Sequence, residues 1–517
     1  MQLKSHITHK NIFLWGLILI AVGMPLSRFL VSVSYFVLLG NWLIERNFVS
    51  KWNTLKTSKT FWAFVGIYLF YVLGLLWTSD YEYGLKDLRT KLPMLWLPIL
   101  FFTSPPLQKK DYHLVMHFFV LACVTASFCS LAAYFGILHK KVYNVRDISL
   151  FESHIRFSLM IVLSIAYVFF SFLKPFLFQQ KIIYLIVTSW LLFFLIFLQS
   201  FTGLVILTIL AFIGIIVFLF SRESVLLKTS FFIIVSCGLF YSVYLIRDEY
   251  KKVYCVNEIN LKALSKLTLN GNTYLNDTIY KFTENSNYVY ILICDDELKK
   301  EWNKRSYFNF DSTDNQKNNL RYTLIRYLTS KGFNKDSVGV SKLSDEDIRN
   351  IESGYANYLY INQKSLRSRV HEIIWEFAMR NHEINGHSLV MRLEFWKTAI
   401  HIIKQHIWFG VGTGDIKIAF TKQYEKENTS LQKTWQLRSH NQYLETTVAL
   451  GLSGLLLFLI HLFAPFFSGK KMSIFFFFFF LIVLLSFVNE DTLETQAGLT
   501  ICVFFTQLLF HNNEYNV

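Results

Sequence analysis

Apolar residues in this chain of 517 residues gather in runs, most of them long enough to cross a lipid bilayer. Nine runs come before residue 247 and three come after residue 443. The pattern predicts an all-α polytopic membrane protein with about twelve transmembrane helices, although several runs are short for a bilayer of about 30 Å. The runs cover residues 11–25, 29–45, 61–77, 92–104, 113–137, 156–173, 182–199, 202–220, 229–246, 444–467, 472–488 and 496–511.

A polar segment of nearly 200 residues, 247–443, separates the ninth run from the tenth and is rich in Lys, Asn, Glu and Tyr. Helical spacing of apolar residues recurs in it at 317–330, 344–360 and 368–379. The acidic residues after Ser344 are typical of the first turn of a helix. We therefore predict three parts: an N-terminal membrane domain (1–246, about nine helices), a large helical domain (247–443) and about three C-terminal membrane helices (444–517).

The charged residues predict how these parts are oriented. Only 17% of residues are charged, against about 25% in an average protein, and the net charge is +15. With the N-terminus in the cytoplasm, every short turn on that side is basic, as the positive-inside rule requires. Both termini are then cytoplasmic and 247–443 lies outside. In a membrane protein such flanks are the commoner explanation of a positive net charge, and a second share of it could serve an anionic substrate, so no nucleic-acid partner is expected. The basic residues of the N-terminus and of these cytoplasmic turns are Lys4, Lys10, Arg46, Lys51, Lys56, Lys59, Lys109, Lys110, Lys174, Lys181, Arg222, Lys228, Lys470 and Lys471.

Cysteine and histidine spacing gives no metal site and suggests no cofactor. None of the six cysteines forms a CxxC pair. Cys255 and Cys294 fall in the segment 247–443, where they could form a disulfide if it is extracytoplasmic or remain free. His382 and His387 resemble a zincin pair but stand five residues apart instead of four, with Gly386 between them. The first apolar run lacks a small-residue cleavage site, so no cleavable signal peptide is expected.

The boundary between the polar segment and the tenth run carries the clearest candidate chemistry. Residues 437–445 read LRSHNQYLE, which places His440 just before an apolar run. An imidazole there would lie near the outer bilayer surface, where it could meet a lipid-linked substrate, and its pKa suits proton transfer near neutral pH. The same histidine could instead snorkel to the interface or cap a helix.

A second candidate is the glycine-rich turn GVGTGD at 410–415, which follows helical apolar spacing between Arg392 and His406. Glycine-rich turns expose backbone N–H groups that can bind phosphate oxygens. Taken alone, the turn is better explained as a tight turn that needs positive φ angles. It is not a dinucleotide-binding fingerprint, because no βαβ unit surrounds it.

A third candidate is a set of basic residues on the predicted outer side, where the positive-inside rule expects few. Arginine suits a diphosphate because its planar fork donates two hydrogen bonds, and Arg156 and Arg89 are the favoured ligands. Nearby acidic residues (Asp80, Glu82, Asp87, Asp147 and Glu152) could instead balance the charge. The acidic turn 489–494 is predicted to be a solvated turn, or else to line a polar cavity. The basic set is Arg28, Lys86, Arg89, Lys91, Lys140, Lys141, Arg146 and Arg156.

Together these motifs resemble the O-antigen ligase and O-antigen polymerase-like superfamily of bacterial envelope enzymes. The resemblance covers essentially the whole chain, including the large domain between the ninth and tenth helices. It is carried by Arg392-x-x-x-Trp396, the glycine-rich turn, HNQYLE at 440–445 and GLSG at 451–454. LRYTLIR at 320–326 and the turn 490–498 look closest to the Bacteroidetes-type versions.

The resemblance implies a metal-independent glycosyltransferase with an all-helical, C-type-like membrane fold in the bacterial inner membrane, its large domain in the periplasm. Its donor would be a glycan on undecaprenyl diphosphate, and its acceptor a sugar of the lipid A–core. His440 would be the general base, and Arg392, Arg156 and Arg89 would hold the diphosphate. We assign Arg438, Gly412 and Gly414 to the same diphosphate site.

One departure and three alternatives stand beside this interpretation. Many members of the superfamily have Ser-Arg-x-Gly where this chain has Ser200-Phe201-Thr202-Gly203, so one arginine is missing. A polymerase that joins repeat units on the same lipid carrier fits the sequence almost as well, and protein-glycosylating relatives use the same scaffold. A transporter of lipid-linked sugars fits less well, because the polar clusters lie at the outer edge of the membrane and not at its centre.

Overall fold

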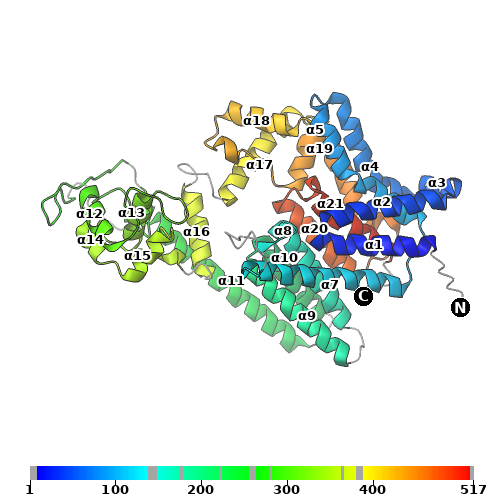
Figure 1. Ribbon diagram of the computed structural model, residues 1–517, viewed down its shortest axis with the longest axis horizontal. Helices are drawn as coiled ribbons and strands as arrows, with labels where there is room; N and C mark the ends of the chain where they lie inside the picture. Colours follow the sequence, from blue (N-terminus) through cyan, green and yellow to red (C-terminus); the bar gives the residue numbers. More distant parts are fainter. Residues whose placement is uncertain are drawn as a thin grey trace. The chain divides into compact units, whose positions relative to one another are not determined.

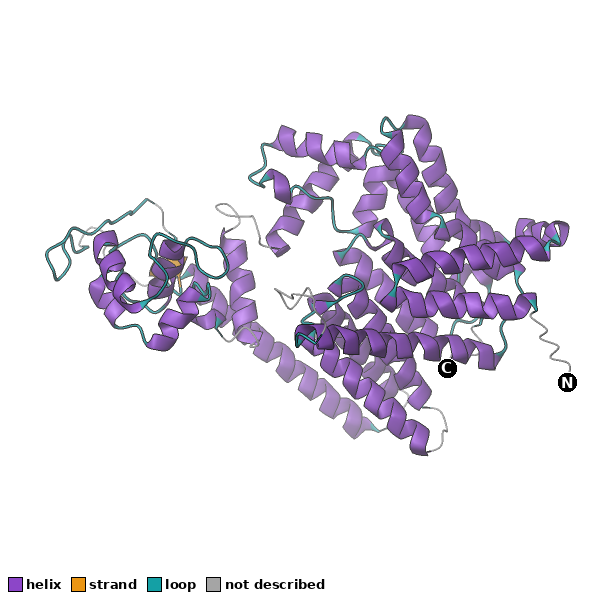
Figure 2. Ribbon diagram, in the orientation of Figure 1, coloured by secondary structure: helices purple, strands orange, loops and turns teal. Residues whose placement is uncertain are grey.

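The computed structural model describes residues 8–137, 148–173, 178–220, 224–255, 264–279, 282–361, 366–379 and 388–512. Helices dominate this part of the chain, and the one small sheet pairs β1 (Thr283–Glu284) with β2 (Asn287–Tyr288) in antiparallel register (Figures 1 and 2). Contacts divide the chain into two compact units, of which the first holds residues 1–221 with 392–517 and the second 222–391.

The first unit contains most of the helices. They are α1 (His9–Leu26), α2 (Arg28–Glu45), α3 (Phe48–Thr57), α4 (Lys59–Leu73), α5 (Tyr81–Lys91), α6 (Pro93–Thr103), α7 (Lys109–Tyr134), α8 (His154–Phe172), α9 (Phe178–Phe197), α10 (Phe201–Phe220), α17 (Ser388–Gln405, whose first residues fall in the second unit), α18 (Ile416–Glu427), α19 (Gln442–Phe463), α20 (Ile474–Asn489) and α21 (Gln496–His511). Short 3₁₀ turns cover Gly74–Trp77 and Thr492–Glu494.

The helices confirm that the protein is an all-α polytopic membrane protein. Nine helices among the described residues are long and apolar enough to cross a bilayer: α1, α2, α4 with its 3₁₀ extension, α7, α8, α9, α10, α11 and α19. The other three predicted spans coincide with shorter apolar helices, α6 of 11 residues and α20 and α21 of 16 each. Twelve crossings therefore remain a prediction.

The core of the first unit is built around α8. Most of its side chains are buried, and it packs against α7, α9, α10, α20 and α21. Six consecutive phenylalanines of α20, residues 475–480, lie in this core. Phe475 and Phe478 contact Phe170 of α8 edge-on. The run is therefore a packing element, with Phe477 as its exposed member.

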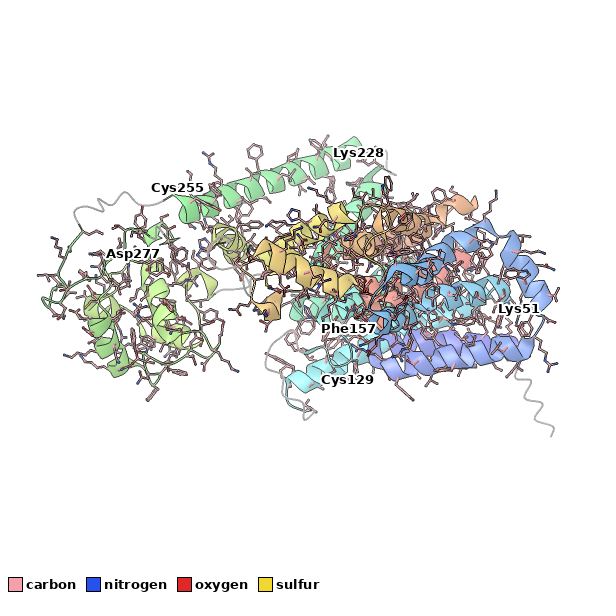
Figure 3. All side chains as sticks on the ribbon, turned by 90° about the horizontal axis from the view of Figure 1, so that it is seen from above. Lys51, Cys129, Phe157, Lys228, Cys255 and Asp277 are labelled. Carbon is pink, nitrogen blue, oxygen red and sulfur yellow. The ribbon has the colours of Figure 1, made fainter. Side chains whose placement is uncertain are left out.

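The second unit holds α11 (Val225–Tyr254), α12 (Asp295–Arg305), α13 (Leu320–Ser330), α14 (Ser337–Ser341), α15 (Asp345–Glu352) and α16 (Leu366–Met379). α11 is unbroken between Lys228 and Cys255 (Figure 3), and it packs on α16. The core of this unit gathers Trp302 and the apolar face of α13. Cys255 is exposed, Cys294 is buried, and both are free thiols.

The helices predicted within the polar segment are confirmed. Ser344 and Asp347 form a reciprocal capping box at the start of α15. α15 ends at Glu352 instead of continuing to residue 360, since Gly354 takes a positive φ of 89°. Residues 392–443 cluster with the helices of the first unit. The predicted domain boundaries mark where the chain leaves the membrane, which this clustering does not test, so they stay a prediction. His382 and His387 lie outside the described residues.

Candidate active site

His440 is held in a fixed turn immediately before α19. Its backbone is left-handed, with φ of 47°. Asn441 is the N-cap residue: its side chain accepts a hydrogen bond from the N–H of Leu444 and donates one to the carbonyl of Val488. The imidazole is 31% exposed. The capping role is therefore taken by the asparagine, which leaves the histidine ring available for other chemistry.

The acidic turn after α20 approaches one edge of this ring. Asp491 Oδ1 lies 3.6 Å from His440 Nδ1, and the ring of Phe395 lies 5.8 Å away, centroid to centroid. Burial lowers the pKa of His440, but the Asp491 carboxylate outweighs it, so the pKa is raised. Nε2 makes no hydrogen bond to any residue that the structure describes.

Arg392 reaches the same turn from α17. Its Nη2 lies 3.3 Å from Glu490 Oε1. Burial raises the pKa of the Glu490 carboxyl, while the nearby charges of His440, Arg392 and Arg156 act in the opposite direction. The structure therefore brings three predicted residues, from α8, α17 and the turn before α19, around Glu490.

Arg156 and Arg89 differ in their surroundings. Arg156 stands in the first turn of α8, half-buried, with its guanidinium 3.4 Å from Ser153 Oγ. Arg89 is exposed on α5, and no ion pair joins it to another described residue. Arg156 thus belongs to the cluster around Glu490, whereas nothing in the structure links Arg89 to it.

Arg438 is engaged by the protein itself. Its guanidinium lies 3.2 Å from Glu445, 3.1 Å from Asp491 and 3.3 Å from Glu494. Burial lowers its pKa, but these three carboxylates raise it well above the ordinary value. Three carboxylate partners leave this guanidinium little capacity for a phosphate, and the diphosphate role assigned to Arg438 stays a prediction.

Beneath Arg438 lies a chain of buried charges. Lys91 is fully buried, with Nζ 2.5 Å from Asp87 and 2.9 Å from Glu494. Burial raises the pKa of Glu494, but Lys91 and Arg438 outweigh it and lower the pKa to about 2. Each buried charge therefore has an opposite charge beside it.

These contacts correct the prediction of a solvated acidic turn. Asp491 and Thr492 are buried, and Glu494 has a side chain only 1% exposed. The sequence showed the acidic residues but not the buried Lys91 and Arg438 that neutralise them. Two of the outer basic residues are paired with neighbouring acidic residues, as the charge-balance alternative expected. Lys91 pairs with Asp87, and Arg28 forms two hydrogen bonds with the carboxylate of Glu152. Lys140, Lys141 and Arg146 lie outside the described residues.

The glycine-rich turn is bonded to neighbouring helices. The N–H groups of Val411 and Gly412 donate to the carbonyls of Val448 and Ala449 at 2.9 Å each. The N–H of Gly414 donates to Thr78 Oγ1 at 2.9 Å. Since these donors are used within the protein, the structure favours the tight-turn alternative, and a phosphate-binding role for Gly412 and Gly414 stays a prediction.

His440, Glu490 and Asp491 also form a group that could hold a cation, because one ligand atom from each lies within 4.8 Å of the others. Each of the two carboxylates already faces an arginine, Glu490 facing Arg392 and Asp491 facing Arg438. These arginines would oppose a bound cation. The two guanidiniums make this group better suited to bind an anion than a cation.

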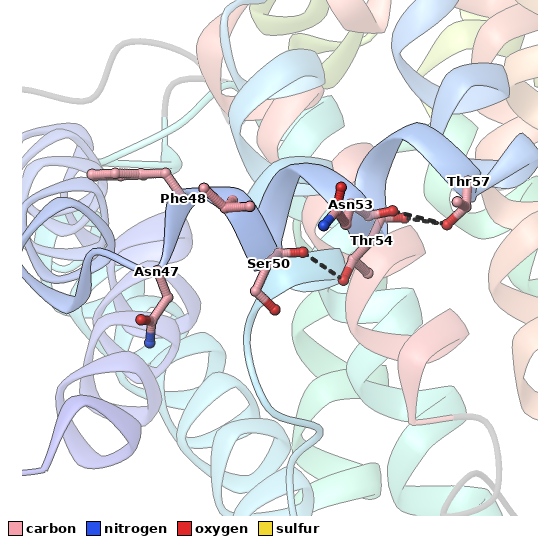
Figure 4. A pocket seen from close by; sticks show the side chains of 7 residues that line it. Asn47, Phe48, Ser50, Asn53, Thr54 and Thr57 are labelled. Carbon is pink, nitrogen blue, oxygen red and sulfur yellow. Dashed lines mark hydrogen bonds between the residues drawn. The ribbon is translucent and has the colours of Figure 1, made fainter.

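A separate concavity lies along α3 (Figure 4). Most of the residues that line it are polar, and the hydroxyls of Thr54 and Thr57 donate hydrogen bonds to carbonyls of the same helix. None of the candidate residues around His440 lines it.

Residues 353–459 match the family model described as O-antigen ligase, and this range contains both Arg392 and His440. This match supports the assignment of the chain to an O-antigen ligase-like family. The family indicates glycan transfer of the O-antigen ligase or polymerase type, with lipid-linked glycan substrates in a membrane. No curated protein matches the chain.

Proposed function

We propose that this O-antigen ligase-like protein transfers a glycan from undecaprenyl diphosphate to a sugar hydroxyl of the lipid A–core, at the periplasmic face of the bacterial inner membrane. The observation that supports it is the cluster in which His440, Arg392 and Arg156 surround the turn at Glu490 and Asp491. A base and two arginines at one place are what acid–base transfer from a diphosphate requires.

The proposed reaction uses His440 as the general base. Asp491 faces Nδ1, which leaves Nε2 to take the proton from the acceptor hydroxyl. The acceptor oxygen then bonds to the anomeric carbon of the donor sugar, while the bond from that carbon to the phosphate oxygen breaks. Undecaprenyl diphosphate departs with the bonding electrons.

Arg392 and Arg156 would bind the departing diphosphate. Both guanidiniums act on Glu490 in the structure, so a phosphate that entered here would replace one carboxylate with a stronger, multivalent anion. Many superfamily members have an arginine where this chain has Phe201. The Asn489 side chain donates a hydrogen bond to Thr202 Oγ1 at 2.8 Å, which brings this segment to the acidic turn. Arg156 also acts on this turn, so it would supply the missing positive charge.

A polymerase acting on the same lipid carrier is the second candidate. The base and donor site described above would serve it unchanged, because only the acceptor differs. The products separate the two reactions.

The experiment is a membrane-vesicle assay with undecaprenyl-diphosphate-linked glycan and purified lipid A–core. We expect decorated lipid A–core from the wild type and a rate roughly 10²- to 10⁴-fold lower from His440→Ala. His440→Asn is the matched variant, since asparagine tolerates the left-handed backbone at this position and also lacks a base. Longer carrier-linked chains without decorated core would establish a polymerase.

Metal independence is tested in the same assay. We expect the rate to be unchanged by a chelator, because Arg392 and Arg438 already pair with Glu490 and Asp491. Loss of turnover that added divalent cations restore would contradict this mechanism. No histidine-dependent product of either kind would point to another acceptor or to transport.

A further inference from the structure

The turn between α17 and α18 is joined to α19 at a break in that helix. Gly451 interrupts α19 with non-helical angles, φ 68° and ψ −167°. Such a break frees backbone groups that a membrane span cannot leave unpaired. The turn supplies the partners: the N–H of Val411 donates to the carbonyl of Val448, and the N–H of Leu452 donates to the carbonyl of Ile407 at 2.8 Å.

The close approach depends on two glycines facing opposite backbones. A Cβ on Gly451 would lie 2.3 Å from the carbonyl of Trp408, and one on Gly410 would lie 2.4 Å from the carbonyl of Ala449. Both glycines have positive φ. The turn is thus built into α19 as a fixed element, and its orientation is set by backbone hydrogen bonds.

This fixed turn presents apolar side chains outward. Ile407 is 43% exposed, Trp408 69% and Phe409 59%. Leu452 and Leu456 of α19 are exposed as well. Three consecutive exposed apolar residues on a rigidly held turn need a nonpolar environment.

The end of α4 sets the level of the turn relative to the bilayer. The apolar stretch of α4 ends at Trp77, and the polar residues Thr78, Ser79 and Asp80 follow. The rings of Trp77 and Phe409 are 6.0 Å apart, and the N–H of Thr413 donates to the carbonyl of Gly74. The turn therefore lies at the level where a candidate span passes from apolar to polar residues. This level corresponds to the membrane–water interface, where tryptophan is enriched.

We propose that Ile407, Trp408 and Phe409 form an apolar anchor that inserts into the lipid leaflet beside the break in α19 at Gly451. The surface takes lipid acyl chains and headgroups, not a protein partner. Ile407 is joined to Leu452 by a backbone hydrogen bond, and Leu452 and Leu456 are exposed on a helix apolar enough to span the bilayer. The anchor fixes the depth of the half of α19 that begins beside His440.

The test is site-directed spin labelling of the full chain in proteoliposomes. Cys237 and Cys255, both exposed, are replaced by serine, and a nitroxide is placed at Phe409→Cys. We expect collisions with oxygen, which partitions into lipid, to exceed collisions with a neutral, water-soluble nickel chelate. The control is Lys422→Cys, on an exposed position of α18, where the chelate should dominate.

Equal access of the chelate to positions 409 and 422 would overturn the proposal. Ile407→Cys provides a second site in case the Phe409 variant does not fold, and it should report the same lipid exposure. The readout does not depend on glycan transfer, so it can fail or succeed independently of the proposed function.

Discussion

The pair formed by His440 and Asp491 sets what the candidate base can do at a given pH. The carboxylate faces Nδ1 and raises the pKa of the imidazole. A base works only in its neutral form, so the rate of transfer should fall as pH drops through this raised pKa.

Asp491→Asn removes the charge that raises the pKa of His440. We expect the acidic limb of the pH–rate profile to move to lower pH, together with a lower maximal rate because the ring loses its orienting partner. The measurement is transfer by membrane vesicles across the pH range. Glu394→Gln, which removes a carboxylate from α17 that pairs with Lys397, should leave the limb in place. A limb that does not move in Asp491→Asn would mean that another group titrates.

Glu490 pairs with Arg392, with its Oε1 3.3 Å from Nη2 of the guanidinium. We expect Glu490→Gln to lower the KM for the lipid-linked donor several-fold, because the diphosphate no longer displaces a carboxylate from the guanidinium. Donor titration measures this effect, and Glu425→Gln on the exposed face of α18 serves as the comparison. A lower rate with unchanged KM would assign Glu490 to the acceptor side instead.

At this scale the sequence could predict only part of the site. His440 and Arg392 stand in recognisable segments, and the sequence marked both. Lys91 and Glu494 are separated by some 400 residues and meet only in the folded bundle, so neither local pattern nor charge count could pair them. The carboxylate partners of Arg438 were hidden for the same reason, since they come from α19 and the acidic turn.

Among the helices, the break in α19 is the feature most sensitive to substitution. Gly451→Ala places a Cβ against the carbonyl of Trp408 at a positive φ, and we expect it to destabilise the protein by at least about 2 kcal/mol. Thermal unfolding in detergent measures the loss. Gly66→Ala lies inside α4 with open space around its Cβ, and its effect should stay within about 1 kcal/mol. Equal stability of the two variants would mean that the joint between the turn and α19 can relax.

In the second unit, Asp347 stabilises both α15 and α13. It completes the capping box and accepts bonds from Tyr327 and Lys331. Although burial opposes it, these bonds lower the pKa of Asp347 from its ordinary 3.8 to about 2. A lowered pKa stabilises the fold above the ordinary value, and this stabilisation is lost as pH falls toward 2.

Asp347→Asn should therefore lower the opening free energy of α13 and α15 by about 2 kcal/mol at neutral pH. Hydrogen exchange on the full chain measures it. Glu346→Gln, an exposed neighbour in the same turn, should have little effect. A difference between wild type and Asp347→Asn that persists below pH 2 would contradict the role of ionisation.

The elements themselves were largely predictable from sequence. Apolar runs and capping residues gave α13, α16 and the start of α15 within a few residues, because these signals are local. The break at Gly451 was not predictable, since a glycine in an apolar run is compatible with a continuous helix until Trp408 packs against it.

For the whole molecule, the predicted orientation can be tested with a native thiol. Cys255 is exposed in the second unit and Cys294 is buried. If residues 247–443 are periplasmic, a membrane-impermeant maleimide should label Cys255 in intact inner-membrane spheroplasts, and Cys255→Ser should lose most of that labelling. A cysteine at Lys470, in a predicted cytoplasmic turn, should react only after permeabilisation. Labelling of Cys255 only after reduction would contradict the free thiol of the structure and favour the disulfide alternative.

The two facing glycines have a consequence for exchanging parts between related enzymes. Gly410 and Gly451 each leave room for the other segment's backbone, so neither stretch can be altered without the other. A chimera that imports the polar segment of a relative, for example to change the accepted sugar, must carry the stretches around residues 410 and 451 as one inherited unit. Swapping at the apparent boundary near residue 443 would divide them between two parents.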